Sequence, residues 1–208
     1  MLAPWAIDEM KNVDLKDKRL NDRLTAVLSQ LGGRPTASIP AACGGSAEMT
    51  AAYRLFDNEK VCFDNVLEPH IAATRRRMAE QPVVILAQDA TEIDLTRPQQ
   101  QVAGTGPLDG GSRRGLFLHP LHAFTPDGTP LGTVHADVWA RDDCPPPPKS
   151  ERAAKRKQTP IEEKESQRWI DMLRRAREEA RRLPETRVVC VADSEADRQK
   201  DCAVDHRE

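Results

Sequence analysis

The chain has 208 residues, and 31% of them are charged. Its formal net charge of −2 excludes neither nucleic acid nor membrane as a partner, so the binding partner has to be inferred from local clusters of charge. Its five cysteines include no Cys-x-x-Cys pair, which argues against a zinc site or a disulfide framework and favours reduced thiols. Met1 opens no apolar signal segment and no run approaches the roughly 18 apolar residues of a membrane span, so we expect a soluble, cytoplasmic protein.

The first segment, to about residue 65, has a helical pattern. Apolar residues recur at helical spacing from Leu15 to Leu31, and Gly32-Gly33 ends this predicted helix. Its opposite face is basic and includes Arg19 and Arg23. A charged face of this kind is either simply solvated or in contact with DNA.

Two further helices are predicted before residue 82. Pro40 favours a turn, and Ser46 is a plausible N-cap for a helix with these inward side chains: Met49, Ala52, Tyr53 and Phe56. Short helices around a glycine-containing turn with flanking arginines are compatible with helix-turn-helix DNA binding. The next helix is predicted from Phe63 to Met78.

From Val83 the pattern changes to strands. Val83–Leu95 predicts the first strand, and its apolar start is typical of a strand buried on both faces. Leu116–Thr125 and Pro130–Arg141 predict the second and third strands, and the turn residues Pro126-Asp127-Gly128 favour a hairpin between them.

After residue 143 the order of the elements changes again. Residues 144–159 contain four consecutive prolines and a basic run, which is either a solvated insertion or a nucleic-acid contact. A long helix then begins at Pro160 or Ile161 and ends before Pro184, with this apolar stripe: Trp169, Ile170, Leu173, Ala176, Ala180 and Leu183. The strand Arg187–Ala192 follows, which gives the order β-β-β-α-β.

Two apolar runs end in an aspartate, the first at Asp89 and the last at Asp193. In open α/β sheets, ligands gather at the carboxyl ends of strands. Two neighbouring strands ending in Asp would bring together hard oxygen ligands that suit Mg²⁺ or Mn²⁺. Alternatively, each aspartate only caps the turn or helix that follows it.

The β-β-β-α-β order resembles the first part of a ribonuclease-H-like fold. The chain also resembles the bacterial cut-and-paste transposases of the Tn-five type, in insertion-sequence family four. The matching pieces extend from Trp5 to Asp197 in the family's order and spacing: DLKDKRLNDRL, SIPAACGGSAEMTAAYRLFDNEKV, QDATEIDL, RRGLFLHP, TPDGTPLG, EEKESQRWI and VADSEAD.

The resemblance implies a domain organisation and an activity. It predicts a helical transposon-end DNA-binding domain in residues 1–65, a connecting helix in 66–82, a partial ribonuclease-H-like catalytic domain in 83–197 and a divergent tail in 198–208. The implied activity is DNA transposition by two-metal phosphoryl transfer with Mg²⁺ or Mn²⁺. Asp89 and Asp193 correspond to the first two acids of the family's DDE triad, and both would bind metal.

The resemblance also suggests which residues contact DNA. Arg19, Arg23, Tyr53 and Arg54 are candidates for the transposon end, although a core position for Tyr53 is slightly favoured. Arg113 and Arg114 match the family's Arg-Gly element near the DNA backbone, or form a solvated hairpin end. For two histidines of the second predicted strand, His119 and His122, ordinary polar contacts are favoured over a metal-ligand role.

The chain departs from the family after Asp197, where the sequence RQKDCAVDHRE is polar throughout. The family's third acid, a Glu, lies well beyond the second Asp, and neither Glu195 nor Glu208 is a good substitute for it. We therefore expect a truncated, inactive copy that still binds DNA, alone or in oligomers with itself or a full-length transposase. The alternatives are a non-catalytic regulatory fragment that interferes with transposition, a relic that folds poorly, and a different metal nuclease of the same fold.

Overall fold

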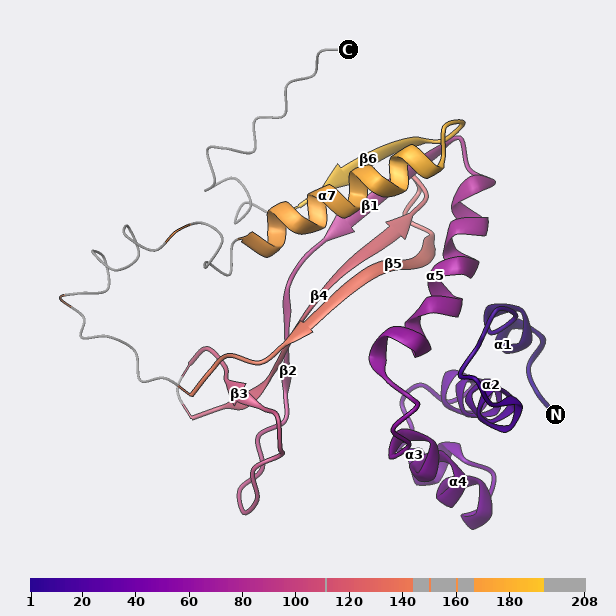
Figure 1. Cartoon of the computed structure of the whole chain (residues 1–208), viewed down its shortest axis with the longest axis vertical. Helices are drawn as coiled ribbons and strands as arrows, with labels where there is room; N and C mark the ends of the chain where they lie inside the picture. The colour runs from indigo at the N-terminus through magenta and orange to yellow at the C-terminus, as the bar shows by residue number, and fades with distance from the viewer. Residues whose placement is uncertain (111, 144–149, 151–159, 161–166, 193–208) are drawn as a thin grey trace. The chain divides into compact units, whose positions relative to one another are not determined.

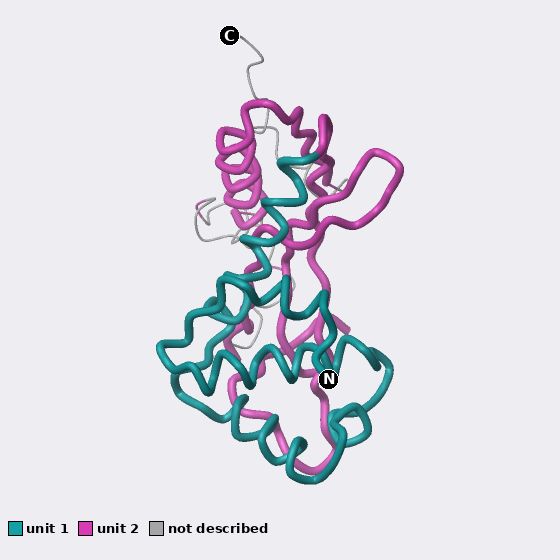
Figure 2. The backbone as a smooth tube through the Cα atoms, turned by 90° about the vertical axis from the view of Figure 1, so that its right-hand side faces the viewer, with its two compact units in different colours: residues 1–80 teal, residues 81–208 magenta. Residues whose placement is uncertain are grey.

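The computed structural model describes residues 1–110, 112–143, 150, 160 and 167–192 (Figure 1). The chain divides into two compact units, Met1–Glu80 and Gln81–Glu208, which Figure 2 shows in separate colours. The described cysteines, Cys43, Cys62 and Cys190, are free thiols, as the sequence predicts. None of the described helices is both long enough and apolar enough to span a bilayer.

The first unit is helical. Its elements are α1 (Pro4–Glu9), α2 (Lys18–Gly32), α3 (Ile39–Ala42), α4 (Ser46–Phe56) and α5 (Phe63–Ala79). Its core is a cluster of buried side chains from α2, α4 and the loops beside them: Met10, Leu15, Leu24, Val27, Cys43, Ala52 and Leu55. The predicted helix to Leu31 and the predicted helix from Phe63 to Met78 are both confirmed.

The segment between these two helices differs from the prediction. Pro40 lies inside the short helix α3, not in a turn, because proline is tolerated in a helix's first turn, where its missing N–H has no intrahelical partner. Gly45, not Ser46, is the N-cap of α4. The buried face of α4 carries Ala52 and Leu55, whereas the predicted inward residues Tyr53 and Phe56 are exposed because each lies one position, or about 100°, further round the helix.

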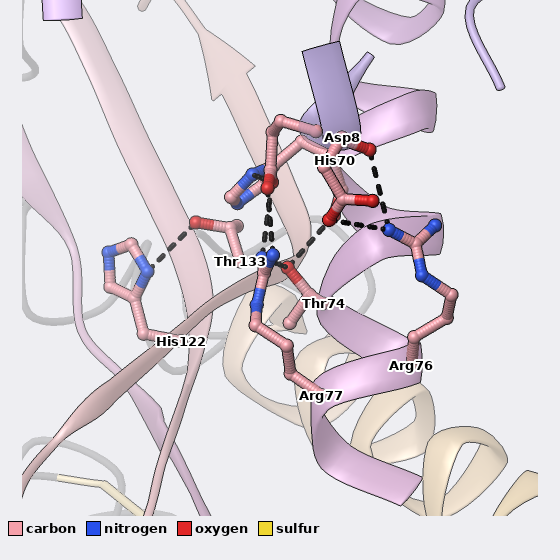
Figure 3. A network of polar contacts seen from close by, with 8 residues as sticks. Asp8, His70, Thr74, Arg76, Arg77, His122 and Thr133 are labelled. Atoms are coloured by element: carbon pink, nitrogen blue, oxygen red, sulfur yellow. Dashed lines mark hydrogen bonds and ion pairs between the residues drawn. The ribbon is translucent and has the colours of Figure 1, made fainter. Parts of the chain in front are cut away.

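Helices α1 and α5 of this unit are joined by ion pairs (Figure 3). Glu9 accepts hydrogen bonds from Arg77 Nη1 at 2.7 Å and Nη2 at 3.1 Å, and it also pairs with His70. Asp8 pairs with Arg76 at 3.2 Å. These contacts connect residues more than sixty positions apart and therefore fix the start of the chain against α5.

The second unit is a mixed sheet with one described helix. Its elements are β1 (Val83–Gln88), β2 (Thr91–Asp94), β3 (Gly106–Pro107), β4 (Arg114–Phe124), β5 (Pro130–Trp139), α7 (Gln167–Arg182) and β6 (Arg187–Val191). The strand order is β2-β4-β1-β6, and β3 and β5 also pair with β4. Strands β1, β2, β3 and β5 run antiparallel to β4, whereas β6 runs parallel to β1.

The single strand predicted over Val83–Leu95 is in fact two strands. Both pair with β4 in one register, with Gln88 opposite Leu121 and Thr91 opposite Leu118, but the ladder is interrupted between these pairs. On β4 the interruption faces Pro120, which has no N–H to give to a ladder. Between β1 and β2, the backbone N–H of Ala90 donates to the Asp89 carboxylate at 2.7 Å. The break therefore falls at Asp89.

The hairpin between β4 and β5 is confirmed. Its turn closes with hydrogen bonds from Thr125 N to Thr129 O and from Gly128 N to Thr125 O, both 2.9 Å long. Gly128 has a φ of +89°, a conformation that glycine adopts without strain. The Asp-Gly turn signal in the sequence thus predicts this connection correctly.

Helix α7 packs on β1, β5 and β6, and Figure 1 shows it lying along β1 and β6. Its most buried residues are Met172, Ala176 and Glu179, so the predicted apolar stripe is confirmed at Ala176 but also contains a buried carboxylate. Burial alternates along β1, where one face is buried and the other half-buried, so the prediction of burial on both faces is only partly confirmed. Val189 and Val191 on the edge strand β6 stay about two-fifths exposed (38% and 43%).

Candidate functional site

Asp89 lies where β1 ends, at the interruption of the ladder, and its side chain is exposed. One carboxylate oxygen accepts the Ala90 N–H, whereas Oδ2 has no hydrogen-bond partner among the described residues. An exposed carboxylate with a free oxygen is a suitable ligand for a hard divalent cation.

The second predicted acid, Asp193, lies outside the described residues. The parallel pairing of β1 with β6 extends to Ala87 opposite Val191, and each of these residues stands two positions before its aspartate. The closeness of the two carboxylates stays a prediction. Within the described ranges, no group of three His, Cys, Asp or Glu side chains is arranged to hold a metal ion.

His119 on β4 is the most unusual polar residue near this site. It is fully buried, both ring nitrogens lack a hydrogen-bond partner in the described part of the chain, and the ring packs on Trp169 of α7 at 4.7 Å between centroids. Burial lowers the pKa of His119; the charges of Asp137 and Asp89 oppose this shift, and those of Arg168 and His135 add to it. The predicted satisfied polar contact is therefore wrong for His119.

His122 on the same strand behaves as the sequence predicts. Its Nδ1 lies 2.9 Å from the Thr133 hydroxyl on β5, a contact drawn in Figure 3. This hydrogen bond joins β4 to β5, so His122 makes an ordinary cross-strand polar contact.

A stack of two aromatic rings with a guanidinium group over each lies beside His119. The rings of Phe117 and Trp139 are parallel to within 17° and 5.4 Å apart. Arg141 lies over Phe117 at 4.2 Å, and Arg168 lies over Trp139 at 4.0 Å. Sequence reasoning missed this stack, because the pairing of Phe117 with Trp139 depends on the register of β4 with β5.

Arg113 and Arg114, two predicted DNA contacts, are already engaged by carboxylates. Arg113 pairs with Glu92 at 2.6 Å and with Asp94 at 3.7 Å. Arg114 binds both oxygens of Asp143 at 2.7 and 2.8 Å, a pairing that raises the pKa of Arg114. A phosphate would have to compete with these partners.

The predicted DNA contacts in the helical unit differ from Arg113 and Arg114, because no carboxylate among the described residues pairs with their arginines. Arg19 and Arg54 are exposed and Arg23 is half-buried, and none of the three pairs with a described carboxylate. Tyr53 is 48% exposed, so the alternative of a core position is wrong. An open pocket of about 540 Å³ lies along α4, with this lining: Thr50, Tyr53, Arg54, Phe56 and Asp57.

Comparison with known proteins identifies one part of the chain. Residues 2–61 match the model of the family described as transposase DNA-binding, a stretch that runs from the start of α1 through α4. No curated protein matches the sequence. The helical unit therefore carries a transposase DNA-binding domain, and the match supports a transposase-related DNA-binding role.

Proposed function

We propose that this chain is a DNA-recombination protein of the cut-and-paste transposase kind, whose helical unit binds a transposon end in double-stranded DNA. The match of residues 2–61 to a transposase DNA-binding family carries the proposal. Arg19, Arg23 and Arg54 of this unit pair with no carboxylate in the part of the chain that the structure describes, and they are suited to backbone phosphates because guanidinium groups bind phosphate oxygens in a fork. The exposed ring of Tyr53 beside Arg54 gives the same surface an aromatic contact.

The second unit is proposed to be a ribonuclease-H-like catalytic unit of the insertion-sequence family four, Tn-five type. Its order β1-β2-β3-β4-β5-α7-β6, in which the antiparallel strands precede the helix and the last strand, supports this assignment, as do the antiparallel pairing of β1 with β4 and the parallel pairing of β6 with β1. The spatial order β5-β4-β1-β6 puts the two strands that lead to Asp89 and Asp193 side by side.

Asp89 and Asp193 are the proposed ligands of Mg²⁺ or Mn²⁺ ions, which when bound activate the attacking oxygen and stabilise the leaving oxygen in phosphoryl transfer. The Asp89 carboxylate fits such ions, because it is exposed and its Oδ2 has no hydrogen-bond partner among the described residues. The hydrogen bond from Ala90 N to Oδ1 holds the carboxylate in place where the ladder opens. Burial lowers the pKa of His119 and so favours the neutral form of the ring near Asp89.

Two measurements on the full chain test these assignments. The first is a mobility-shift assay of the protein with labelled DNA from either flank of the gene that encodes it. Unlabelled duplex of mixed sequence is added as competitor. We expect one flank to be retained selectively. The slope of log K against log salt should be about −0.9 for each phosphate that the protein neutralises. Arg19→Ala should reduce that slope, whereas the control Lys18→Ala, whose charge is paired with Asp22 at 2.6 Å, should leave it nearly unchanged. A flat salt dependence for the wild type contradicts the DNA-binding proposal.

The second measurement is nicking of the retained DNA with Mg²⁺ or Mn²⁺. Cleavage that disappears in Asp89→Asn supports a catalytic transposase. Binding without cleavage supports the second candidate, a non-catalytic regulatory fragment that occupies transposon ends. This candidate is favoured by one observation: the matched DNA-binding domain lies entirely in the first unit, separate from Asp89.

A further inference from the structure

We propose that Arg168 binds a backbone phosphate of DNA that passes Asp89, and that Trp139 positions the guanidinium group for this contact. The inference rests on the proposed function, because it needs DNA at the sheet unit. It adds a nucleic-acid contact that the sequence did not indicate, at the start of the described part of α7.

The first support is the way Arg168 is held. Its guanidinium lies over the Trp139 ring at 4.0 Å from the centroid, and that ring is itself stacked on Phe117, which is buried in the sheet. A guanidinium group stacked on an aromatic face keeps its N–H donors available around its edge. The stack therefore restricts the side chain without using its donors, which lowers the entropy lost when it binds a ligand.

The second support is the charge of Arg168, which no described carboxylate neutralises. By contrast, Arg141 of the same stack pairs with Asp109 at 2.7 Å. On α7, Arg174 pairs with Asp171 at 2.7 Å and Arg175 with Glu178 at 3.1 Å. The contrast is sharpest between Arg141 and Arg168, which lie at opposite ends of one aromatic stack. Only the Arg168 end of this stack presents a cation with no acidic partner among the described residues.

The third support is the position of Arg168 relative to Asp89. Both charges act on the buried ring of His119, Asp89 raising its pKa and Arg168 lowering it. Arg168 and Trp169 are consecutive, and Trp169 packs directly on His119. The cation and the exposed carboxylate therefore both lie near one histidine, an arrangement that suits a DNA strand whose phosphates need a positive partner next to a metal-binding acid.

The test is binding of the full chain to a fluorescein-labelled, mixed-sequence duplex of about 30 base pairs, followed by anisotropy over a salt series. Arg168→Gln should weaken binding by about tenfold at low salt, as expected for one charge-assisted hydrogen-bonding contact. It should also lower the slope of log K against log salt by about 0.9, the value for one phosphate. Arg168→Lys should keep the slope but bind more weakly, because an ammonium group cannot reproduce the stacked fork.

The matched control is Arg175→Gln, which removes a paired arginine from the same helix and should change neither affinity nor slope appreciably. Circular dichroism melts establish that each variant is folded. Trp139→Leu keeps the charge of Arg168 but removes the ring on which it stacks, so this variant should weaken binding as Arg168→Lys does. Equal losses in Arg168→Gln and Arg175→Gln would overturn the inference, as would an unchanged slope in Arg168→Gln. Full affinity in Arg168→Lys would overturn the positioning role of Trp139. A wild-type chain that fails to bind DNA would instead overturn the proposed function.

Discussion

The guanidinium of Arg77 on α5 binds both carboxylate oxygens of Glu9 at the end of α1, at 2.7 and 3.1 Å. The Glu9 side chain is only 14% exposed, and it also pairs with His70. Burial alone raises the pKa of Glu9, but the hydrogen bonds and charges of Arg77 and His70 outweigh that effect, so the net pKa is lowered. This fork is therefore a stabilising contact inside the transposase DNA-binding unit.

Glu9→Ala is expected to lower the free energy of unfolding of the helical unit by about 2–4 kcal/mol. The cost is large because the substitution removes the mostly buried carboxylate that both Arg77, a half-buried cation, and His70 pair with. Urea denaturation followed by far-ultraviolet circular dichroism measures the change. The control is Asp22→Ala, which removes an exposed carboxylate paired with Lys18 and should hardly move the unfolding midpoint. Similar shifts in both variants would contradict the role assigned to Glu9.

The burial of His119 predicts a loss of stability at acidic pH in the sheet unit. Its folded pKa lies below the ordinary value of 6.5, so the unfolded chain binds more protons as the pH falls below about 6.5. Stability should then decrease toward lower pH, by at most about 1.4 kcal/mol per pH unit from this one group, until the folded pKa is reached. His119→Leu should flatten this dependence between pH 7 and pH 5. A slope that is the same in both proteins would exclude His119 as its source.

Gly115 on β4 allows the close approach of β2 and should not tolerate a side chain. A Cβ at this position would lie 1.9 Å from the Ile93 carbonyl oxygen and 2.9 Å from Leu108 Cδ1. Gly115→Ala is expected to break the pairing of β2 and β3 with β4, at a cost of about 3 kcal/mol or more, because backbone has to move. Thermal melts and amide hydrogen exchange at β2 measure this. Gly44→Ala, where an added Cβ meets nothing within 4 Å, is the control and should leave the melt unchanged.

Asp89→Asn is expected to weaken the binding of Mn²⁺, followed by electron paramagnetic resonance, by about tenfold or more, because a neutral amide is a poorer ligand for a hard dication. Its affinity for DNA in the absence of metal should not fall, since the substitution removes a negative charge. Asp142→Asn, at another exposed carboxylate of the same unit, controls for the general effect of charge. Equal Mn²⁺ binding by the wild type and Asp89→Asn would remove Asp89 from the metal site.

Local sequence determined the helices α2 and α5 and the β4–β5 hairpin. Apolar spacing and Gly32-Gly33 predict α2, and the hairpin follows from the Asp-Gly turn, because these signals depend on neighbouring residues alone. The apolar runs that lead to Asp89 and Asp193 also predict β1 and β6.

Tertiary structure decided how polar groups are used. The strand break at Asp89 lies opposite Pro120 of another strand. The buried ring of His119, which has no hydrogen-bond partner among the described residues, packs on Trp169, fifty positions later. Arg113 and Arg114 look like free cations in the sequence, yet Glu92 and Asp143 pair with them, whereas Arg168 stands in a charged run and has no described acidic partner. Ion pairs and burial join residues distant in the chain, so periodicity along the sequence predicts the elements but not which charges remain free to bind a ligand.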